Sequence, residues 1–303
     1  MRLPLAVVAL LTLALPLGAA DPEPGGVLVL TAEARDYVFG AGGTLAKMAA
    51  EGKPVYIVHF GNGEKDASGL KPSEARLAHE AEAKKAAAEL GAKETLFLGH
   101  KSGELAYLSS SELRNQAIML TRFYKPEILF FPDWYVHYLP DDDTYRVGRM
   151  AEESPYGGGD YFLQEGTYMG LEGYAARQYY FYSPQRPYRP REGGEGKAQF
   201  VGVDVGATFD KKLAAALALE TPNRRYAEQV QARLAAAGRL PSALSEITPR
   251  SIRDLVATYL EELAETIGER HGFARAEEFN HLGLSPGVPE HIRERAVEIG
   301  AQR

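Results

Sequence analysis

The sequence predicts an α/β fold: a three-layer α/β/α sandwich built around a mostly parallel, Rossmann-like sheet. Short apolar segments bounded by glycine or proline recur in the first half of the chain, and segments of helical composition separate them. Such alternation is typical of right-handed βαβ units, which place helices on both faces of a parallel sheet. The chain has 303 residues, of which 45% are hydrophobic and 25% charged, as in ordinary globular proteins.

The first half predicts four strands and three helices. Gly52 and Gly91 are expected to end the first two helices, because glycine readily adopts the left-handed conformation found after a helix. Ligands of parallel sheets bind at the carboxyl ends of the strands, so the loops after these strands are the candidate site. The strands are Gly26–Leu30, Pro54–Phe60, Glu94–Leu98 and Glu127–Phe131, and the helices are Tyr37–Ala50, Ser73–Leu90 and Ser109–Tyr124.

The second half predicts an aromatic-rich insertion at about 134–195, followed by a helical C-terminal part. The stretch from Trp134 to Tyr188 holds the single tryptophan and eleven of the 17 tyrosines. Because no break in composition indicates a second domain, residues 21–303 are predicted to form one domain. Two further strands are expected at Arg177–Tyr182 and Phe200–Val205, and helices at Phe209–Leu219, Arg224–Ala237 and Ser251–Glu269.

Residues 1–20 have the pattern of a secretory signal peptide. The basic start Met1–Arg2 precedes the apolar stretch Leu3–Leu17 and the small residues Gly18–Ala20. The apolar stretch is shorter than the roughly 20 residues of a membrane span. We expect export to the periplasm or the cell exterior, with no membrane span after cleavage; an uncleaved anchor is the alternative.

Charge and cysteine content exclude several classes of protein. Lysine and arginine number 34 against 41 acidic residues, which gives a net charge of −7. This balance argues against a nucleic-acid partner, because such a surface needs clustered basic charge. The absence of cysteine excludes a disulfide scaffold, a thiolate zinc site and a cysteine nucleophile.

The loop after the first strand carries the most specific motif, Thr-Ala-Glu-Ala-Arg-Asp-Tyr-Val-Phe-Gly-Ala-Gly-Gly-Thr-Leu-Ala at 31–46. It resembles the signature of the LmbE-like, or PIG-L, N-deacetylases: Ala-Pro-His-Pro-Asp-Asp-Glu, two apolar residues, then Gly-x-Gly-Gly-Thr-Leu-Ala. The glycines lie too far from the strand for a dinucleotide loop, and we expect them to allow close helix–sheet packing. Further matching segments follow in the same order: Gly61–Glu64, His79–Gly91, Leu98–Gly99, Pro126–Phe130, Asp141–Arg149 and Phe209–Ala215.

The resemblance implies hydrolysis of an acetamide on an amino sugar. In that family a zinc ion with three protein ligands activates water, and a carboxylate acts as the base. Carried onto this sequence, the first ligand falls on Glu33, the base on Arg35 and the retained ligand on Asp36. The histidines of the later motif fall on Asp141 and Thr144. The family's substrate-binding arginine falls on His79, and an aspartate of the third loop on Ser102.

These replacements predict a catalytically degraded relative. Arg35 cannot act as a base, because a guanidinium stays protonated at physiological pH. We expect it to pair with Asp36 or with an aspartate of 141–143, so that a guanidinium replaces the cation, while these aspartates cap the following helix. The alternative is an active N-deacetylase that holds zinc in a rebuilt, carboxylate-rich centre drawn from Glu33, Asp36, His137 and Asp141–Asp143.

Aromatic side chains directly after the fourth strand are expected to rim the pocket. Because aromatic rings stack on the apolar faces of sugars, a saccharide is one predicted partner. A protein is the other predicted partner. The alternative is that the aromatic residues only pack the loop against the sheet. A third hypothesis is an unrelated exported α/β binding protein, but the ordered set of motifs argues against it. The expected cofactor is none, or zinc if the protein is active, with Asp36 and Glu33 as ligands. The predicted pocket residues are Arg35, His79, Trp134, Tyr135, His137 and Asp141.

Overall fold

The computed structural model describes residues 22–134, 142–159, 162–168, 170–183, 200–282 and 295. The predicted signal peptide at 1–20 therefore lies outside the described residues. In the described part of the chain, no helix combines the length and the apolar character that a membrane crossing requires.

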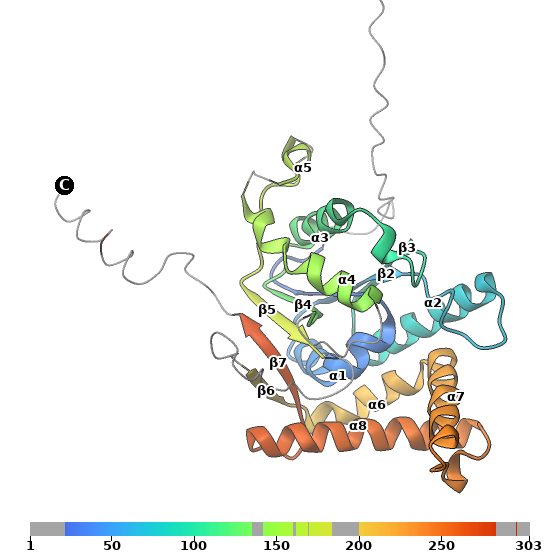
Figure 1. Cartoon of the computed structure of the whole chain (residues 1–303). Coiled ribbons are helices and arrows are strands. Elements are labelled where there is room, and N and C mark those ends of the chain that lie inside the picture. Colours follow the sequence, from blue (N-terminus) through green and yellow to red (C-terminus); the bar gives the residue numbers. More distant parts are fainter. Residues whose placement is uncertain are drawn as a thin grey trace, which may run out of the picture.

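A seven-stranded sheet forms the middle layer, in the order β3-β2-β1-β4-β5-β7-β6 (Figure 1). The first five of these strands are parallel, and β7 runs antiparallel to both of its neighbours. The predicted mostly parallel sheet is confirmed. The strands are β1 Val27–Thr31, β2 Val55–Gly61, β3 Glu94–His100, β4 Ile128–Pro132, β5 Gln178–Tyr182, β6 Phe200–Asp204 and β7 Ala276–Leu282.

Helices cover both faces of the sheet. Helices α1, α2, α6 and α8 contribute to the core on one face, while α3 and α4 cover the other (Figure 1). The helices are α1 Ala34–Ala50, α2 Pro72–Glu89, α3 Ser110–Tyr124, α4 Asp142–Ala151, α5 Gln164–Tyr168, α6 Phe209–Leu217, α7 Glu220–Ala236 and α8 Pro249–His271. Short 3-10 helices are η1 Leu105–Tyr107, η2 Ser154–Gly158, η3 Gly206–Thr208 and η4 Ser242–Leu244.

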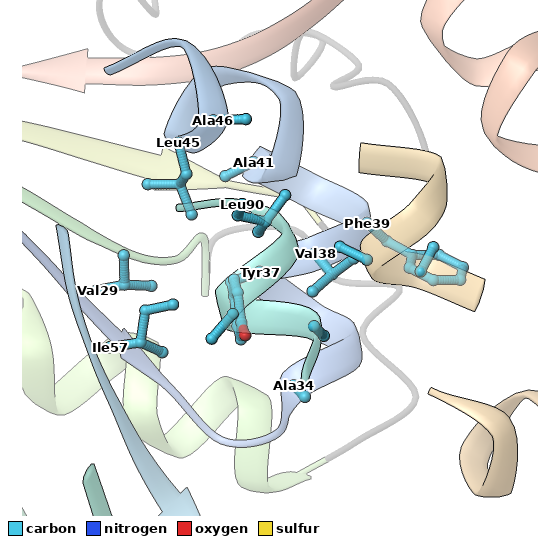
Figure 2. Close-up of a cluster of buried hydrophobic side chains, with 14 of the residues drawn as sticks. Val29, Ala34, Tyr37, Val38, Phe39, Ala41, Leu45, Ala46, Ile57 and Leu90 are labelled. Atoms are coloured by element: carbon cyan, nitrogen blue, oxygen red, sulfur yellow. The ribbon is translucent and has the colours of Figure 1, made fainter. Parts of the chain in front are cut away.

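The core is divided by the alternation of side chains along each strand. Val27 and Val29 of β1 pack toward α1, while Leu28 and Leu30 pack toward α3 and α4. All of these side chains are fully buried. Figure 2 shows the first cluster, in which Val29, Ile57 and the buried face of α1 meet. Burial on both faces explains why the strands read as continuous apolar runs.

The glycines of α1 let the helix approach its neighbours closely, as predicted. A Cβ atom on Gly43 would lie 2.7 Å from Cβ of Val205, and one on Gly40 would lie 2.9 Å from Cδ2 of Tyr182. Either contact would force neighbouring groups apart. The prediction that these glycines serve packing is confirmed.

Two of the differences from the predicted fold bear on the core and on the candidate site. Strand β7 was missed, and α1 begins at Ala34 instead of Tyr37, so Arg35 and Asp36 lie in its first turn. This early start matters for the site, because the direction of a side chain in a helix differs from that in an extended loop.

A buried ion pair joins β7 to α6, and its carboxylate also binds α1. Nζ of Lys212 in α6 lies 2.7 Å from a carboxylate oxygen of Glu277 in β7, and each side chain is only 2% exposed. The same carboxylate accepts hydrogen bonds from the backbone N–H groups of Gly43 (2.9 Å) and Thr44 (2.8 Å) in α1. Glu277 thus holds three segments together.

A second buried charge, that of Arg122, binds the backbone of the aromatic-rich insertion. Arg122 of α3 is fully buried, and its guanidinium donates to five backbone carbonyl oxygens. One of them belongs to Leu163, which adopts a left-handed backbone conformation with φ of 54°. The acceptors are the carbonyls of Gly157, Gly159, Phe162, Leu163 and Leu171, at 2.9–3.4 Å.

Candidate functional site

Two positions that the resemblance assigns to metal ligands are joined by a hydrogen bond. The hydroxyl of Thr144, near the start of α4, donates to a carboxylate oxygen of Asp36 in the first turn of α1, at 2.8 Å. Both residues lie beyond the carboxyl edge of the parallel strands. At position 144 the family resemblance implies an imidazole, whereas this chain has a hydroxyl group. This hydroxyl stabilises the carboxylate of Asp36 by a hydrogen bond, without a cation.

Arg35 points away from this centre. Its guanidinium lies over the ring of Tyr226 in α7, 3.9 Å from the ring centroid, and 4.9 Å from that of Phe39. No ion pair between Arg35 and a carboxylate is found in the described part of the chain. The predicted pairing with Asp36 is therefore wrong. The reason is the early start of α1, which directs position 35 toward α7 and a cation–π contact.

The donor set does not fit the zinc ion that the family resemblance implies. Glu33 and Asp36 supply carboxylates, but Thr144 supplies a hydroxyl that already donates to Asp36. Within the described ranges, no group of three or more histidine, aspartate or glutamate side chains is arranged to hold a metal ion. His137 and Asp141, the other candidates, lie outside the described residues, as does Tyr135.

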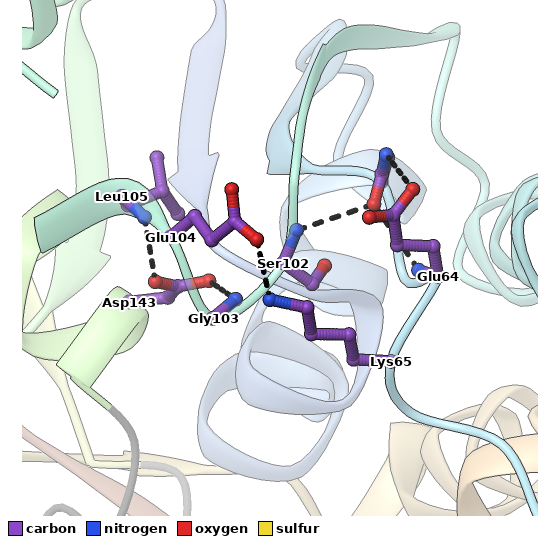
Figure 3. A network of polar contacts seen from close by, with 8 residues as sticks. Glu64, Lys65, Ser102, Gly103, Glu104, Leu105 and Asp143 are labelled. Atoms are coloured by element: carbon purple, nitrogen blue, oxygen red, sulfur yellow. Dashed lines mark hydrogen bonds and ion pairs between the residues drawn. The ribbon is translucent and has the colours of Figure 1, made fainter. Parts of the chain in front are cut away.

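Asp143, in the first turn of α4, connects this helix to the loop after β3. Its carboxylate accepts hydrogen bonds from the backbone N–H groups of Gly103 and Leu105 (Figure 3). Burial raises the pKa of this carboxyl group, and the two backbone donors oppose that shift. Asp142 and Asp143 lie in the first turn of α4, where their charge favours the helix; Asp141, the residue before the helix, lies outside the described residues.

A small open cavity lies between α2 and the carboxyl end of β2. Its volume is about 20 Å³, and its lining includes Glu33, His59, Asn62, His79, Glu80 and Phe97. His79 is mostly buried, and its Nε2 atom lies 2.9 Å from the carbonyl oxygen of Asp66, to which it donates. The predicted pocket residue His79 therefore lines a cavity, together with Glu33.

His59 also lines the cavity and is uncharged. Its ring stacks on Phe97 at 4.7 Å, and its Nε2 atom is buried without a hydrogen-bond partner. Burial, and next the neighbouring His79, lower its pKa to about 3.

His59 predicts a specific pH dependence of stability. In the unfolded chain the pKa of His59 is about 6.5. The unfolded chain therefore binds a proton at His59 more tightly than the folded protein does, and the free energy of unfolding decreases as the pH falls below that value. Between pH 6.5 and 5 we expect His59 to remove about 2 kcal/mol from the free energy of unfolding. Urea titrations at both pH values should show that His59→Phe lacks this loss. Equal pH dependence in both proteins would contradict the assignment.

Trp134 packs on α4. Its Nε1 atom donates to a carboxylate oxygen of Glu152, its ring meets that of Tyr145 edge to face at 6.1 Å, and the guanidinium of Arg149 lies 5.1 Å from the ring centroid. Of the two alternatives for this residue, these contacts favour packing over a role in the pocket rim.

Sequence reasoning missed two buried polar residues at the same edge of the sheet. Asp133 follows β4 and is 1% exposed, and Tyr182 ends β5 and is fully buried. Burial, and secondly the charge of Asp36, raise the pKa of Tyr182 well above its ordinary value. Their position in the sequence could have revealed them, because each residue lies at the end of a parallel strand.

Comparison with known proteins gives one family-model match, in the N-terminal part of the chain. Residues 28–143 match the family model described as PIG-L: GlcNAc-PI de-N-acetylase. The resemblance drawn from the motifs is thereby confirmed. A search of the curated proteins gave no match.

Several solved structures share this fold, and their alignments cover most of the chain. N,N'-diacetylchitobiose deacetylase from Pyrococcus horikoshii is 21% identical over 88% of both chains, with a TM-score of 0.66. The conserved protein TT1542 from Thermus thermophilus is 22% identical over 87% of this chain and 97% of its own (TM-score 0.60). GalB, the 4-carboxy-2-hydroxymuconate hydratase from Pseudomonas putida, is 18% identical over 88% and 98% (TM-score 0.59). A hydratase among them shows that this fold serves more than one reaction.

Proposed function

We propose that this protein is a deacetylase-like relative of the PIG-L family, whose model residues 28–143 match, and that it no longer hydrolyses acetamides and binds a saccharide at the carboxyl edge of its sheet. The observation that carries the proposal is the hydrogen bond between Thr144 and Asp36 at 2.8 Å. It joins two positions that need to face a shared cation in a metal-dependent hydrolase. A missing ligand and a missing base together remove the activated water.

Restoring the ligands tests this proposal directly. The double variant Glu33→His and Thr144→His, with the native Asp36, supplies two imidazoles and one carboxylate and leaves a fourth position open. We expect it to bind about one zinc ion per chain, because three such ligands are sufficient for a catalytic zinc site. Zinc measured by mass spectrometry after dialysis should be stoichiometric in the variant and absent from the native protein.

The matched control adds Asp36→Ala to the double variant, which should lose the zinc. Acetate release from N,N'-diacetylchitobiose is measured in parallel. Stoichiometric zinc in the native protein that is lost on Asp36→Ala, or acetate release by the native protein, would refute the degraded state.

The second candidate is an active metal-dependent N-deacetylase with a rebuilt centre. One observation favours it: Arg35 lies over Tyr226, so its guanidinium does not occupy the position of the cation, and the carboxylates of Glu33 and Asp36 remain. The metal measurement above separates the two candidates, because only the active enzyme needs the ion.

Export remains part of the proposal. The apolar stretch Leu3–Leu17 followed by small residues supports cleavage before Asp21. Intact-mass analysis of protein from the periplasm or culture medium should give a mature chain that begins there. A chain that retains Met1 and stays inside the cell would refute this part.

A further inference from the structure

We propose that the guanidinium of Arg35 binds a carboxylate of the ligand, so that the saccharide bound at the carboxyl edge of the sheet is an acidic one of the uronic acid type. This inference rests on the proposed function, because it names the chemical class of that saccharide. Three properties of Arg35 support it: its hydrogen-bond donors, the fixed position of its guanidinium and its place beside the candidate site.

The guanidinium of Arg35 donates to no protein atom in the part of the chain that the structure describes. Its contacts there are with two aromatic rings, that of Tyr226 at 3.9 Å and that of Phe39 at 4.9 Å from the ring centroid. A guanidinium carries five N–H donors. Arg122 uses its donors on five carbonyl oxygens. The donors of Arg35 are instead available to an acceptor on a ligand.

The two rings fix the position of the guanidinium. An aromatic ring attracts a cation through its face, and it provides no oxygen acceptor there. Arg35 is also half-buried, so its side chain is already ordered in the folded protein. A group that is ordered beforehand loses less conformational entropy when a ligand binds. The planar fork of a guanidinium matches the two oxygens of a carboxylate, which makes a carboxylate a suitable partner.

Arg35 lies between two residues of the candidate site. Glu33, two positions earlier, lines the small open cavity, and Asp36, the next residue, accepts the hydrogen bond from Thr144. Because consecutive Cα atoms are about 3.8 Å apart, a ligand at this edge of the sheet is within reach of the arginine side chain. The guanidinium is turned toward α7, so the carboxylate binds on the α7 side of the site and the sugar extends from it over the first turn of α1.

The charges near Arg35 favour a carboxylate over a phosphate. Glu33 and Asp36 are acidic neighbours in the sequence, and they repel a phosphate monoester, with a charge of about −1.5 to −2 at pH 7, more strongly than a singly charged carboxylate. Arg225, the residue before Tyr226 in α7, has its own partner, because its Nε atom lies 3.4 Å from a carboxylate oxygen of Asp66. One guanidinium thus faces the ligand and matches one negative charge.

Four sugars that differ at one carbon atom test the inference: glucuronate, its methyl ester, glucose and glucose 6-phosphate. Each is titrated into isotope-labelled protein, and binding is followed by nuclear magnetic resonance at the Nε–Hε signal of Arg35, which is assigned by its loss in Arg35→Lys. We expect glucuronate to shift this signal and to bind at least about tenfold more tightly than the ester or glucose, a difference of about 1.4 kcal/mol. Glucose 6-phosphate should bind less tightly than glucuronate.

Variants separate the charge of Arg35 from its positioning. Arg35→Gln should abolish the preference for glucuronate over its ester. Tyr226→Leu removes the ring that holds the guanidinium and should weaken the preference, whereas Tyr226→Phe keeps the ring and should retain it. The matched control is Arg250→Gln, which removes one positive charge from a side chain that is 91% exposed and should leave the preference intact. Circular dichroism checks that each variant is folded.

Equal binding of glucuronate, its ester and glucose would overturn the inference while leaving a saccharide-binding protein. A preference that survives Arg35→Gln would place the carboxylate elsewhere and would also overturn it. If Arg35→Gln does not fold, the two variants of Tyr226 decide, and an equal preference in both would count against the inference. Tighter binding of glucose 6-phosphate, or no measurable binding of any of the four sugars, would overturn it too. The zinc and acetate measurements decide the loss of hydrolysis independently.

Discussion

Replacement of Lys212 by methionine is expected to lower the free energy of unfolding by about 3–5 kcal/mol, the range for removing one partner of a buried ion pair. The variant keeps the volume of the side chain but leaves the carboxylate of Glu277 buried with only the N–H groups of Gly43 and Thr44 as partners. Urea denaturation followed by circular dichroism measures the loss.

Lys84→Met is the matched control for this experiment. Lys84 also pairs with a glutamate at 2.7 Å, but its side chain is 55% exposed, and we expect a loss below about 0.5 kcal/mol. The double variant Lys212→Met and Glu277→Gln should recover part of the stability, because no uncompensated charge remains in the core. Equal losses for Lys212→Met and Lys84→Met would show that burial does not govern the strength of this pair.

Replacement of Arg122 by methionine should be about as damaging, at roughly 3–5 kcal/mol. Five carbonyl oxygens would lose a charged donor inside the protein. The bond that helps to hold Leu163 in its left-handed conformation would also be lost, and that conformation costs about 1–2 kcal/mol for a residue with a side chain.

Hydrogen exchange distinguishes this effect from general destabilisation. Amides between 157 and 171 should lose protection before those of the central strands. The control is Arg250→Met, because Arg250 is 91% exposed and lies 3.8 Å from Asp254; it should change neither exchange nor stability. Uniform loss of protection across the sheet would contradict a local organising role for Arg122.

The sequence was sufficient to predict the parallel part of the sheet, because strands buried on both faces read as apolar runs. Strand β7 was missed for the opposite reason. Its residues include Glu277 and Glu278, which are 2% and 4% exposed, and acidic residues suggest a surface. Their burial depends on Lys212, Arg270 and His271, partners in other elements that no local pattern reveals.

At the candidate site, the family motif predicted which positions come together, and Asp36 and Thr144 indeed meet. The partner of Arg35 was mispredicted, and the bonds of Asp143 to a neighbouring loop were not predicted. Arg35 contacts a ring that follows 191 residues later in the chain, and Asp143 binds the N–H groups of Gly103 and Leu105. Side-chain direction at the start of a helix depends on where the helix begins, which composition leaves uncertain by several residues.

The position of β7 has a consequence for biosynthesis. This strand fills the gap between β5 and β6, and its Glu277 bonds to an amide 234 residues earlier in the chain. A nascent polypeptide therefore lacks an internal strand of its sheet, and the hydrogen bonds of Glu277 to α1, until the ribosome has made residues 276–282. Contacts of such long sequence separation form late, and the incomplete sheet edge needs protection until they do.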